Sequence, residues 1–90
     1  MMLEQTVTIC NKLGLHARAA AKFVATASEF ESEIEIEKDG RRVNGKSIMG
    51  VMMLAASNGS LITLYVDGND AEPAMEKLTR LVASRFGEDE

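Results

Sequence analysis

Alternation of apolar and polar residues predicts four β-strands. Residues 3–10 and 61–66 are rich in β-branched side chains, and the first of these segments keeps leucine, valine and isoleucine on one face, with one glutamine among them. The segment SEIEIEKDGRRV, residues 32–43, alternates isoleucine with glutamate and contains Asp39-Gly40, a favoured two-residue hairpin turn. We therefore expect two single strands and one hairpin with a solvated face.

Three other segments repeat their apolar residues at helical spacing. We expect helices over His16–Ser28, Ser47–Leu54 and Ala71–Phe86, the last with Pro73 in its first turn, where proline is tolerated. The residues expected to face the core are Ala20, Phe23, Val24 and Ala27 in the first helix, Ile48, Val51 and Leu54 in the second, and Ala74, Leu78, Leu81, Val82 and Phe86 in the third.

The resulting order of elements is β-α-β-β-α-β-α, which predicts an α+β fold. Three helices would lie on one face of a four-stranded antiparallel sheet, in two layers, with the other face of the sheet solvated. The length of 90 residues allows one domain over 1–90, in which residues 86–90 are expected to form a frayed tail.

Charge is unevenly distributed along the chain. Ten basic and 14 acidic residues give a formal net charge of −4, which argues against a general nucleic-acid binder because such binders rely on basic residues that contact phosphates. Basic residues nevertheless surround the only histidine, His16, with no acidic residue between them. These residues are Lys12, Arg18 and Lys22.

The single cysteine, Cys10, excludes an intramolecular disulfide and the usual multi-cysteine zinc sites. With only one histidine as well, we expect no metal site. The amino terminus has no basic segment followed by an apolar one, and no apolar run is long enough to span a bilayer. We therefore expect a cytoplasmic protein that does not bind membranes.

His16 falls at the first turn of the first predicted helix, a position with distinctive chemistry. The leading backbone N–H groups of a helix lack intrahelical partners, and the macrodipole adds partial positive charge there. An imidazolium is disfavoured at that end, which would keep a ring nitrogen of His16 nucleophilic. A phosphoryl group on that nitrogen would meet free N–H donors, and the guanidinium of Arg18 would add hydrogen bonds to its oxygens. Gly14 would allow the tight turn that precedes the helix.

Other interpretations of His16 follow from the residues alone. A lone histidine in a small domain is more often a surface or capping residue than a nucleophile. A triad hydrolase lacks support, because no serine or cysteine is visibly matched with a histidine base and an orienting acid.

Two segments resemble the signatures of the HPr family, the histidine phosphocarriers of the bacterial phosphotransferase system. NKLGLHARAAAKFV is similar to the active-site segment of that family, and GKSIMGVMMLAA is similar to the segment around its regulatory serine. The resemblance extends over essentially the whole chain and implies an open-faced two-layer β-sandwich. It implies that His16 accepts a phosphoryl group on Nδ1 from enzyme I and passes it to an EIIA protein, with Arg18 and the backbone amides of Ala17 and Arg18 contacting the phosphoryl group.

One position departs from the family pattern. Ala19 stands where the family has proline, in GLH-x-RPA. Alanine favours the helix, but the fixed φ of proline is lost and one more N–H donor is present. The change bears on the lability of the phosphohistidine and on the choice of partner.

Ser47 has two interpretations. The resemblance implies that it matches the serine that HPr kinase/phosphorylase modifies in some bacteria. A serine before an apolar helix is also a good N-cap, which would account for it without any modification.

The resemblance also implies a docking surface for partner proteins beside His16. Its apolar centre would come from a methionine-rich helix too short to bury every side, and a ring of basic residues would steer acidic partners towards it. The residues assigned to this surface are Lys12, Ala21, Lys22, Lys46, Ile48, Met49 and Met52, together with Arg18. Simple solvation is the alternative for each of the charged residues.

The resemblance implies a monomeric relay that acts stoichiometrically, without a metal or cofactor of its own. Its partners would be a general or nitrogen-type enzyme I, an EIIA protein and HPr kinase/phosphorylase. FGEDE and NKLGLHAR also resemble NPr, the nitrogen branch, so sugar uptake and regulation both stay open. Two alternatives belong to other functional classes. A regulatory module that transfers no phosphoryl group typically lacks the histidine, whose presence here counts against it. A domain that binds a small molecule would need a pocket, which nothing in the sequence indicates.

Overall fold

Four strands form one antiparallel sheet in the computed structural model, which describes residues 1–90. The strands are β1 (Met2–Thr8), β2 (Glu33–Lys38), β3 (Arg41–Asn44) and β4 (Leu61–Asp67). Their order in the sheet is β1-β4-β2-β3, so the last strand of the chain lies between the first and the second. The register pairs Thr6 with Thr63 across β1 and β4, and Ile36 with Leu64 across β2 and β4.

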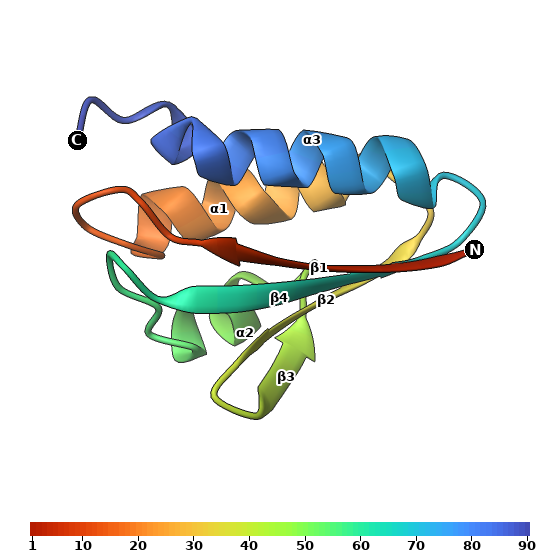
Figure 1. Ribbon diagram of the computed structural model, residues 1–90, viewed down its shortest axis with the longest axis horizontal. Helices are drawn as coiled ribbons and strands as arrows, with labels where there is room; N and C mark the ends of the chain where they lie inside the picture. Colours follow the sequence, from red (N-terminus) through yellow and green to blue (C-terminus); the bar gives the residue numbers. More distant parts are fainter.

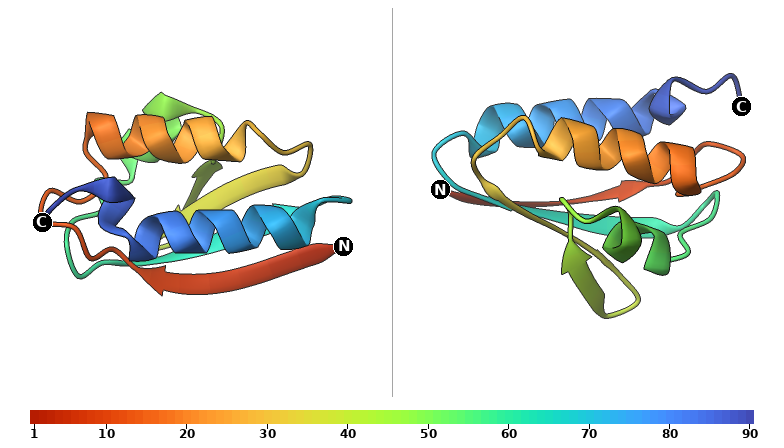
Figure 2. Two further views of the ribbon diagram at one scale, coloured as in Figure 1. Left: turned by 90° about the horizontal axis from the view of Figure 1, so that it is seen from above. Right: turned by 180° about the vertical axis from the view of Figure 1, so that it is seen from behind.

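The helices are α1 (Ala17–Ala27), α2 (Ile48–Met53) and α3 (Ala71–Ala83), and a short 3-10 turn, Arg85–Gly87, follows the last of them. Helices α1 and α3 run side by side over one face of the sheet, and α2 lies next to α1 (Figures 1 and 2). The predicted α+β fold with a four-stranded antiparallel sheet and three helices is confirmed. None of the helices has both the length and the apolar character needed to span a bilayer.

The core lies between the sheet and α1 and α3. Because side chains alternate along a strand, one face of the sheet presents buried apolar residues while the other stays polar. The fully buried large residues include Phe23, Ile36, Ile62, Leu64, Val66, Leu78 and Val82. On the solvated face, the guanidinium of Arg42 lies 3.6 Å from the ring centroid of Tyr65, whose hydroxyl donates to Glu37 at 2.8 Å.

Several predictions about the helices need correction. Ile48 was expected in the core, but it is 43% exposed, because α2 turns only Val51 and the following Leu54 inward. The third helix was expected to reach Phe86, but it ends at Ala83. Arg85 and Phe86 then adopt positive φ angles of 59° and 56°, which turn the chain. Phe86 is fully buried all the same.

The expectation that residues 86–90 are frayed is also wrong for this structure. The backbone N–H of Lys12 donates to the carbonyl of Glu90 at 2.9 Å, and the Glu88 side chain hydrogen-bonds two residues near the start of α1. The tail therefore lies beside the beginning of α1, as the position of the C-terminus in Figure 2 shows. Polar partners from a distant part of the chain hold the tail in place.

Candidate functional site

The turn before α1 is fixed by close backbone packing. Gly14 has a φ of 65°, and a Cβ there would lie 2.8 Å from Cα of Ser57, besides overlapping the carbonyl oxygen of Ala56. The N–H of Leu15 donates to that same carbonyl at 2.8 Å. A side chain at position 14 would separate these segments, so the glycine allows the chain to enter α1 at this point.

His16 occupies the N-cap position of α1 but does not cap it. Its backbone is extended, with φ −70° and ψ 177°, and its side chain makes no bond to the helix amides. The first intrahelical bond runs from the N–H of Ala20 to the carbonyl of His16 at 2.8 Å. The amides of Ala17, Arg18 and Ala19 come earlier and have no intrahelical acceptor. The interpretation of His16 as a capping residue is therefore wrong, and the helix start keeps unused donors.

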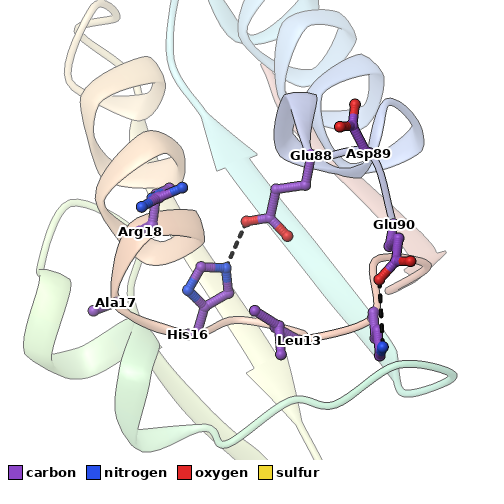
Figure 3. Close-up of a pocket in the computed structure, with 8 residues that line it drawn as sticks. Leu13, His16, Ala17, Arg18, Glu88, Asp89 and Glu90 are labelled. Carbon is purple, nitrogen blue, oxygen red and sulfur yellow. Dashed lines mark hydrogen bonds and ion pairs between the residues drawn. The ribbon is translucent and has the colours of Figure 1, made fainter.

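The imidazole of His16 is held by a residue from the opposite end of the chain. Its Nε2 lies 2.5 Å from Oε2 of Glu88, 72 residues away (Figure 3). The second oxygen of this carboxylate, Oε1, accepts a hydrogen bond of 3.0 Å from Nδ2 of Asn11. Asn11 is fully buried and also donates to the carbonyl of Gly14 at 2.8 Å. The ring, the tail and the turn before α1 thus form one hydrogen-bonded unit.

The ionisation of Glu88 determines what each ring nitrogen does. The hydrogen bond from Asn11, followed by the one from His16, lowers the pKa of Glu88 below its ordinary value. An ionised carboxylate only accepts hydrogen bonds, so Nε2 of His16 must carry a proton and donate it. In the neutral ring the lone pair then lies on Nδ1, which makes no hydrogen bond within the chain and faces away from Glu88 in Figure 3.

Sequence reasoning found His16 but missed Glu88 and Asn11. Neither residue belongs to a local pattern: Asn11 stood in a short connector, and Glu88 in an acidic tail.

A hollow of about 830 Å³ opens over the histidine. Its wall is largely polar and charged, and Arg18 is exposed there without an ion pair. The lining residues are Lys12, Leu13, His16, Ala17, Arg18, Glu88, Asp89 and Glu90. Free N–H donors and an unpaired guanidinium suit a small anionic group better than an apolar ligand.

Ser47 is confirmed as the N-cap of α2. Its Oγ accepts a hydrogen bond from the N–H of Gly50 at 3.0 Å, and its side chain is half-buried. The capping role accounts for this serine structurally, and its modification stays a prediction.

The lysines expected around His16 are not simply solvated. Lys12 pairs with Glu90 at 3.3 Å, and Lys22 donates to the carbonyl of Phe86 at 2.7 Å. Lys46 donates to the carbonyl of Phe30 at 2.7 Å, which places its ammonium beyond the C-terminal end of α1. Since α1 is about 16 Å long at 1.5 Å per residue, Lys46 lies far from His16 and the ring of basic charge is incomplete.

The apolar part of the expected docking surface is present on α2. Met49 is 70% exposed and Met52 38%, and Ile48 joins them because it faces solvent. Met53, which was not assigned to this surface, is exposed as well. Ala21 on the neighbouring α1 is half-buried.

Comparisons with known proteins agree on one family. Residues 3–84 match the family model PTS-HPr, described as the PTS HPr component phosphorylation site. The chain is 57% identical to phosphocarrier protein HPr of Neisseria meningitidis serogroup A, over 99% of this chain and 100% of that protein. It is 46% identical to phosphocarrier protein NPr of Shewanella violacea, over 96% and 94%. The crystal structure of HPr-C-His from Thermoanaerobacter tengcongensis superposes with a TM-score of 0.94 at 51% identity, over 98% and 99% of the two chains.

Proposed function

Because the chain belongs to the HPr family of phosphocarriers of the phosphotransferase system, we propose that Nδ1 of His16 accepts a phosphoryl group from phospho-enzyme I and donates it to an EIIA protein. The observation that carries this proposal is the geometry of the ring. Glu88 accepts a hydrogen bond from Nε2–H, so the lone pair of the neutral ring lies on Nδ1 and faces away from the tail. The helix amides next to the ring have no acceptor. A nucleophile and a binding site for its charged product therefore lie next to each other.

The phosphoryl group would be held by groups that the fold leaves unused. The amides of Ala17 and Arg18 precede the first intrahelical bond, and the guanidinium of Arg18 has no partner within the chain. Ala19, which replaces the family's proline, is buried and keeps α1 intact. Its N–H adds a third donor at the same helix end.

The protein would act as a relay that depends on its partners' active sites. His16 lies in an open hollow that does not enclose the reacting group, so each transfer would be completed by the active site of enzyme I or EIIA. We assign docking of these partners to the exposed face of α1 and α2 next to the histidine. The residues assigned are Lys12, Arg18, Ala21, Lys22, Ile48, Met49 and Met52, with Lys46 at the far end of α1. The protein would work as a cytoplasmic monomer without a metal or cofactor.

Transfer can be tested with phosphoenolpyruvate and purified enzyme I. An acid-labile, base-stable phosphoryl adduct is expected on the wild-type chain and not on His16→Ala. The same reaction is run with general enzyme I and with nitrogen-type enzyme I, and each product is then offered to the matching EIIA protein. The pair that transfers the phosphoryl group faster assigns the protein to the sugar or the nitrogen branch. Absence of an adduct with both enzymes, or an adduct that persists in His16→Ala, would contradict the proposal.

Modification of Ser47 is a second, regulatory proposal. Its Oγ lies at the start of a helix, where added negative charge is tolerated, and next to the exposed methionines of α2. A phosphoryl group there would replace the Oγ cap and add charge to the docking surface. Incubation with HPr kinase/phosphorylase and ATP should give an acid-stable adduct that is absent in Ser47→Ala. If none forms, Ser47 serves only as a cap.

A further inference from the structure

The C-terminal tail is anchored on both sides of Glu88. Before it, Phe86 is fully buried and its carbonyl accepts a hydrogen bond of 2.7 Å from Nζ of Lys22. After it, Glu90 accepts from the backbone N–H of Lys12 at 2.9 Å and pairs with its ammonium at 3.3 Å. The position of Glu88 is therefore determined by four contacts of its neighbours, independently of its own bond to His16.

The carboxylate of Glu88 is itself bound through both oxygens. Oε2 accepts from Nε2 of His16 at 2.5 Å and Oε1 from Nδ2 of Asn11 at 3.0 Å. The side chains of His16 and Glu88 are only 27% and 15% exposed, so water screens this pair less than it screens a surface ion pair. Asn11, which is fully buried, links the carboxylate to the carbonyl of Gly14. Rotation of the His16 ring would break its bond to Glu88.

We propose that Glu88 is a positioning residue for phosphoryl transfer, which fixes the Nε2–H tautomer and the orientation of His16 so that Nδ1 alone is presented to the donor. This inference rests on the proposed role of His16 as acceptor. In the transfer step, the lone pair of Nδ1 forms the N–P bond while the bond between phosphorus and the donor breaks and its electron pair leaves with the donor. The proton stays on Nε2, so the ring becomes positively charged, and the adjacent carboxylate of Glu88 offsets that charge.

The role of Glu88 differs from that of its neighbours in the tail. Asp89 and Glu90 line the same hollow and carry the same charge, but neither contacts the ring. Glu90→Gln is therefore a matched control: it removes one negative charge from the hollow and the ion pair with Lys12, but it keeps the backbone bond from Lys12 to Glu90 and both bonds of Glu88.

The test compares wild type, Glu88→Ala, Glu88→Gln and Glu90→Gln by two measurements. Nitrogen-15 NMR of the His16 ring, at a pH where the ring is neutral, reports the tautomer in the absence of any phosphoryl donor. The initial rate of phosphorylation at limiting enzyme I reports the rate of phosphoryl transfer. In wild type and Glu90→Gln we expect the Nε2–H tautomer alone. In Glu88→Ala we expect a mixture of tautomers and a rate lower by about tenfold, the lower end of the loss found when metal-ligating histidines lose their orienting partners.

Glu88→Gln removes the negative charge of residue 88 and keeps a side chain of the same shape, so it separates the effect of charge from that of ring orientation. It also provides a test if Glu88→Ala fails to fold. Its amide offers one acceptor oxygen to two donors, Nε2 of His16 and Nδ2 of Asn11, so we expect the tautomer preference to be kept in part and the rate to fall by less than in Glu88→Ala. An unchanged tautomer in Glu88→Ala, an unchanged rate in that variant, or an equal loss of rate in Glu90→Gln would overturn the inference. If the wild type accepts no phosphoryl group, the proposed function fails, whereas the NMR measurement still decides whether Glu88 fixes the ring.

Discussion

Two helix starts in this small fold are built in opposite ways. At α2, the Oγ of Ser47 turns back and accepts from the N–H of Gly50. At α1, the side chain of His16 occupies the same N-cap position but turns outward to Glu88. The leading amides of α1 are thereby left for an external ligand, whereas in α2 the amide of Gly50 is taken by Ser47. A residue at an N-cap position thus becomes available for chemistry when a distant group binds its side chain and prevents it from capping.

The largest expected effect comes from removing the anchor of the tail. Phe86→Ala should lower the free energy of unfolding by about 3–5 kcal/mol, because a fully buried aromatic ring is lost from the core. It should also break the hydrogen bond between Glu88 and His16. The Gly50 amide should stay protected from hydrogen exchange, with a free energy of opening that reaches the lowered free energy of unfolding. Chemical denaturation and amide exchange measure the two effects, and Met49→Ala, at an exposed position, is the control. Retention of the Glu88 to His16 bond in Phe86→Ala would show that the tail does not depend on this anchor.

Arg18 should matter for transfer and hardly at all for folding. Arg18→Gln removes an exposed guanidinium without an ion pair, so the free energy of unfolding should change by less than about 0.5 kcal/mol. The rate of phosphorylation should fall by about tenfold, the value of one hydrogen bond to a charged group. Thermal unfolding measures the change in stability, and single-turnover kinetics measure the change in the rate of phosphorylation. A large loss of stability with an unchanged rate would reverse the role assigned to this residue.

A smaller effect distinguishes the two N-caps directly. Ser47→Ala should lower the free energy of unfolding by about 1 kcal/mol, because the Gly50 amide loses its acceptor. In a Glu88→Ala background, where the imidazole has already lost its partner, His16→Ala should cost less, because its side chain caps nothing. Urea unfolding of Ser47→Ala, and of Glu88→Ala with and without His16→Ala, makes the comparison. An equal or larger loss from His16→Ala in that background would mean that the start of α1 depends on the imidazole for its stability.

The smallest expected effect concerns the dependence of stability on acid pH. Asp70 accepts from Ser32 and from the backbone of Glu31, and these hydrogen bonds, that of the Ser32 hydroxyl first, lower its pKa. A lowered pKa contributes stability that is present above the unfolded value, about 4, and is lost as the pH falls below it. Asp70→Asn should therefore flatten the decline in unfolding temperature below pH 4. An unchanged slope would contradict this assignment.

The sequence predicted the elements well because each has a local signal. Alternating isoleucines and Asp39-Gly40 predicted the hairpin, and helical spacing placed His16 at the start of α1 and Ser47 at the start of α2. Ile48 was misplaced because a helix of six residues has too few turns for periodicity to decide which side is buried.

The part of the site that could not be predicted depends on tertiary contacts. Glu88 reaches His16 across 72 residues, and no spacing rule connects an acidic tail with a histidine at the other end of the chain. The break after Ala83, where Arg85 and Phe86 adopt positive φ, directs the tail towards α1, and neither residue type favours that conformation. Lys46 was assigned to the docking surface beside His16, whereas its ammonium lies at the opposite end of α1.

The central claim is that His16 accepts a phosphoryl group on the nitrogen that Glu88 leaves unoccupied. Phosphorus-31 and nitrogen-15 NMR of the chain, labelled in its only histidine and phosphorylated with phosphoenolpyruvate and enzyme I, identifies the nitrogen directly. We predict a single adduct in which Nδ1 couples to phosphorus and Nε2 carries a proton. Phosphorus on Nε2, or no histidine adduct with either type of enzyme I, would contradict the account.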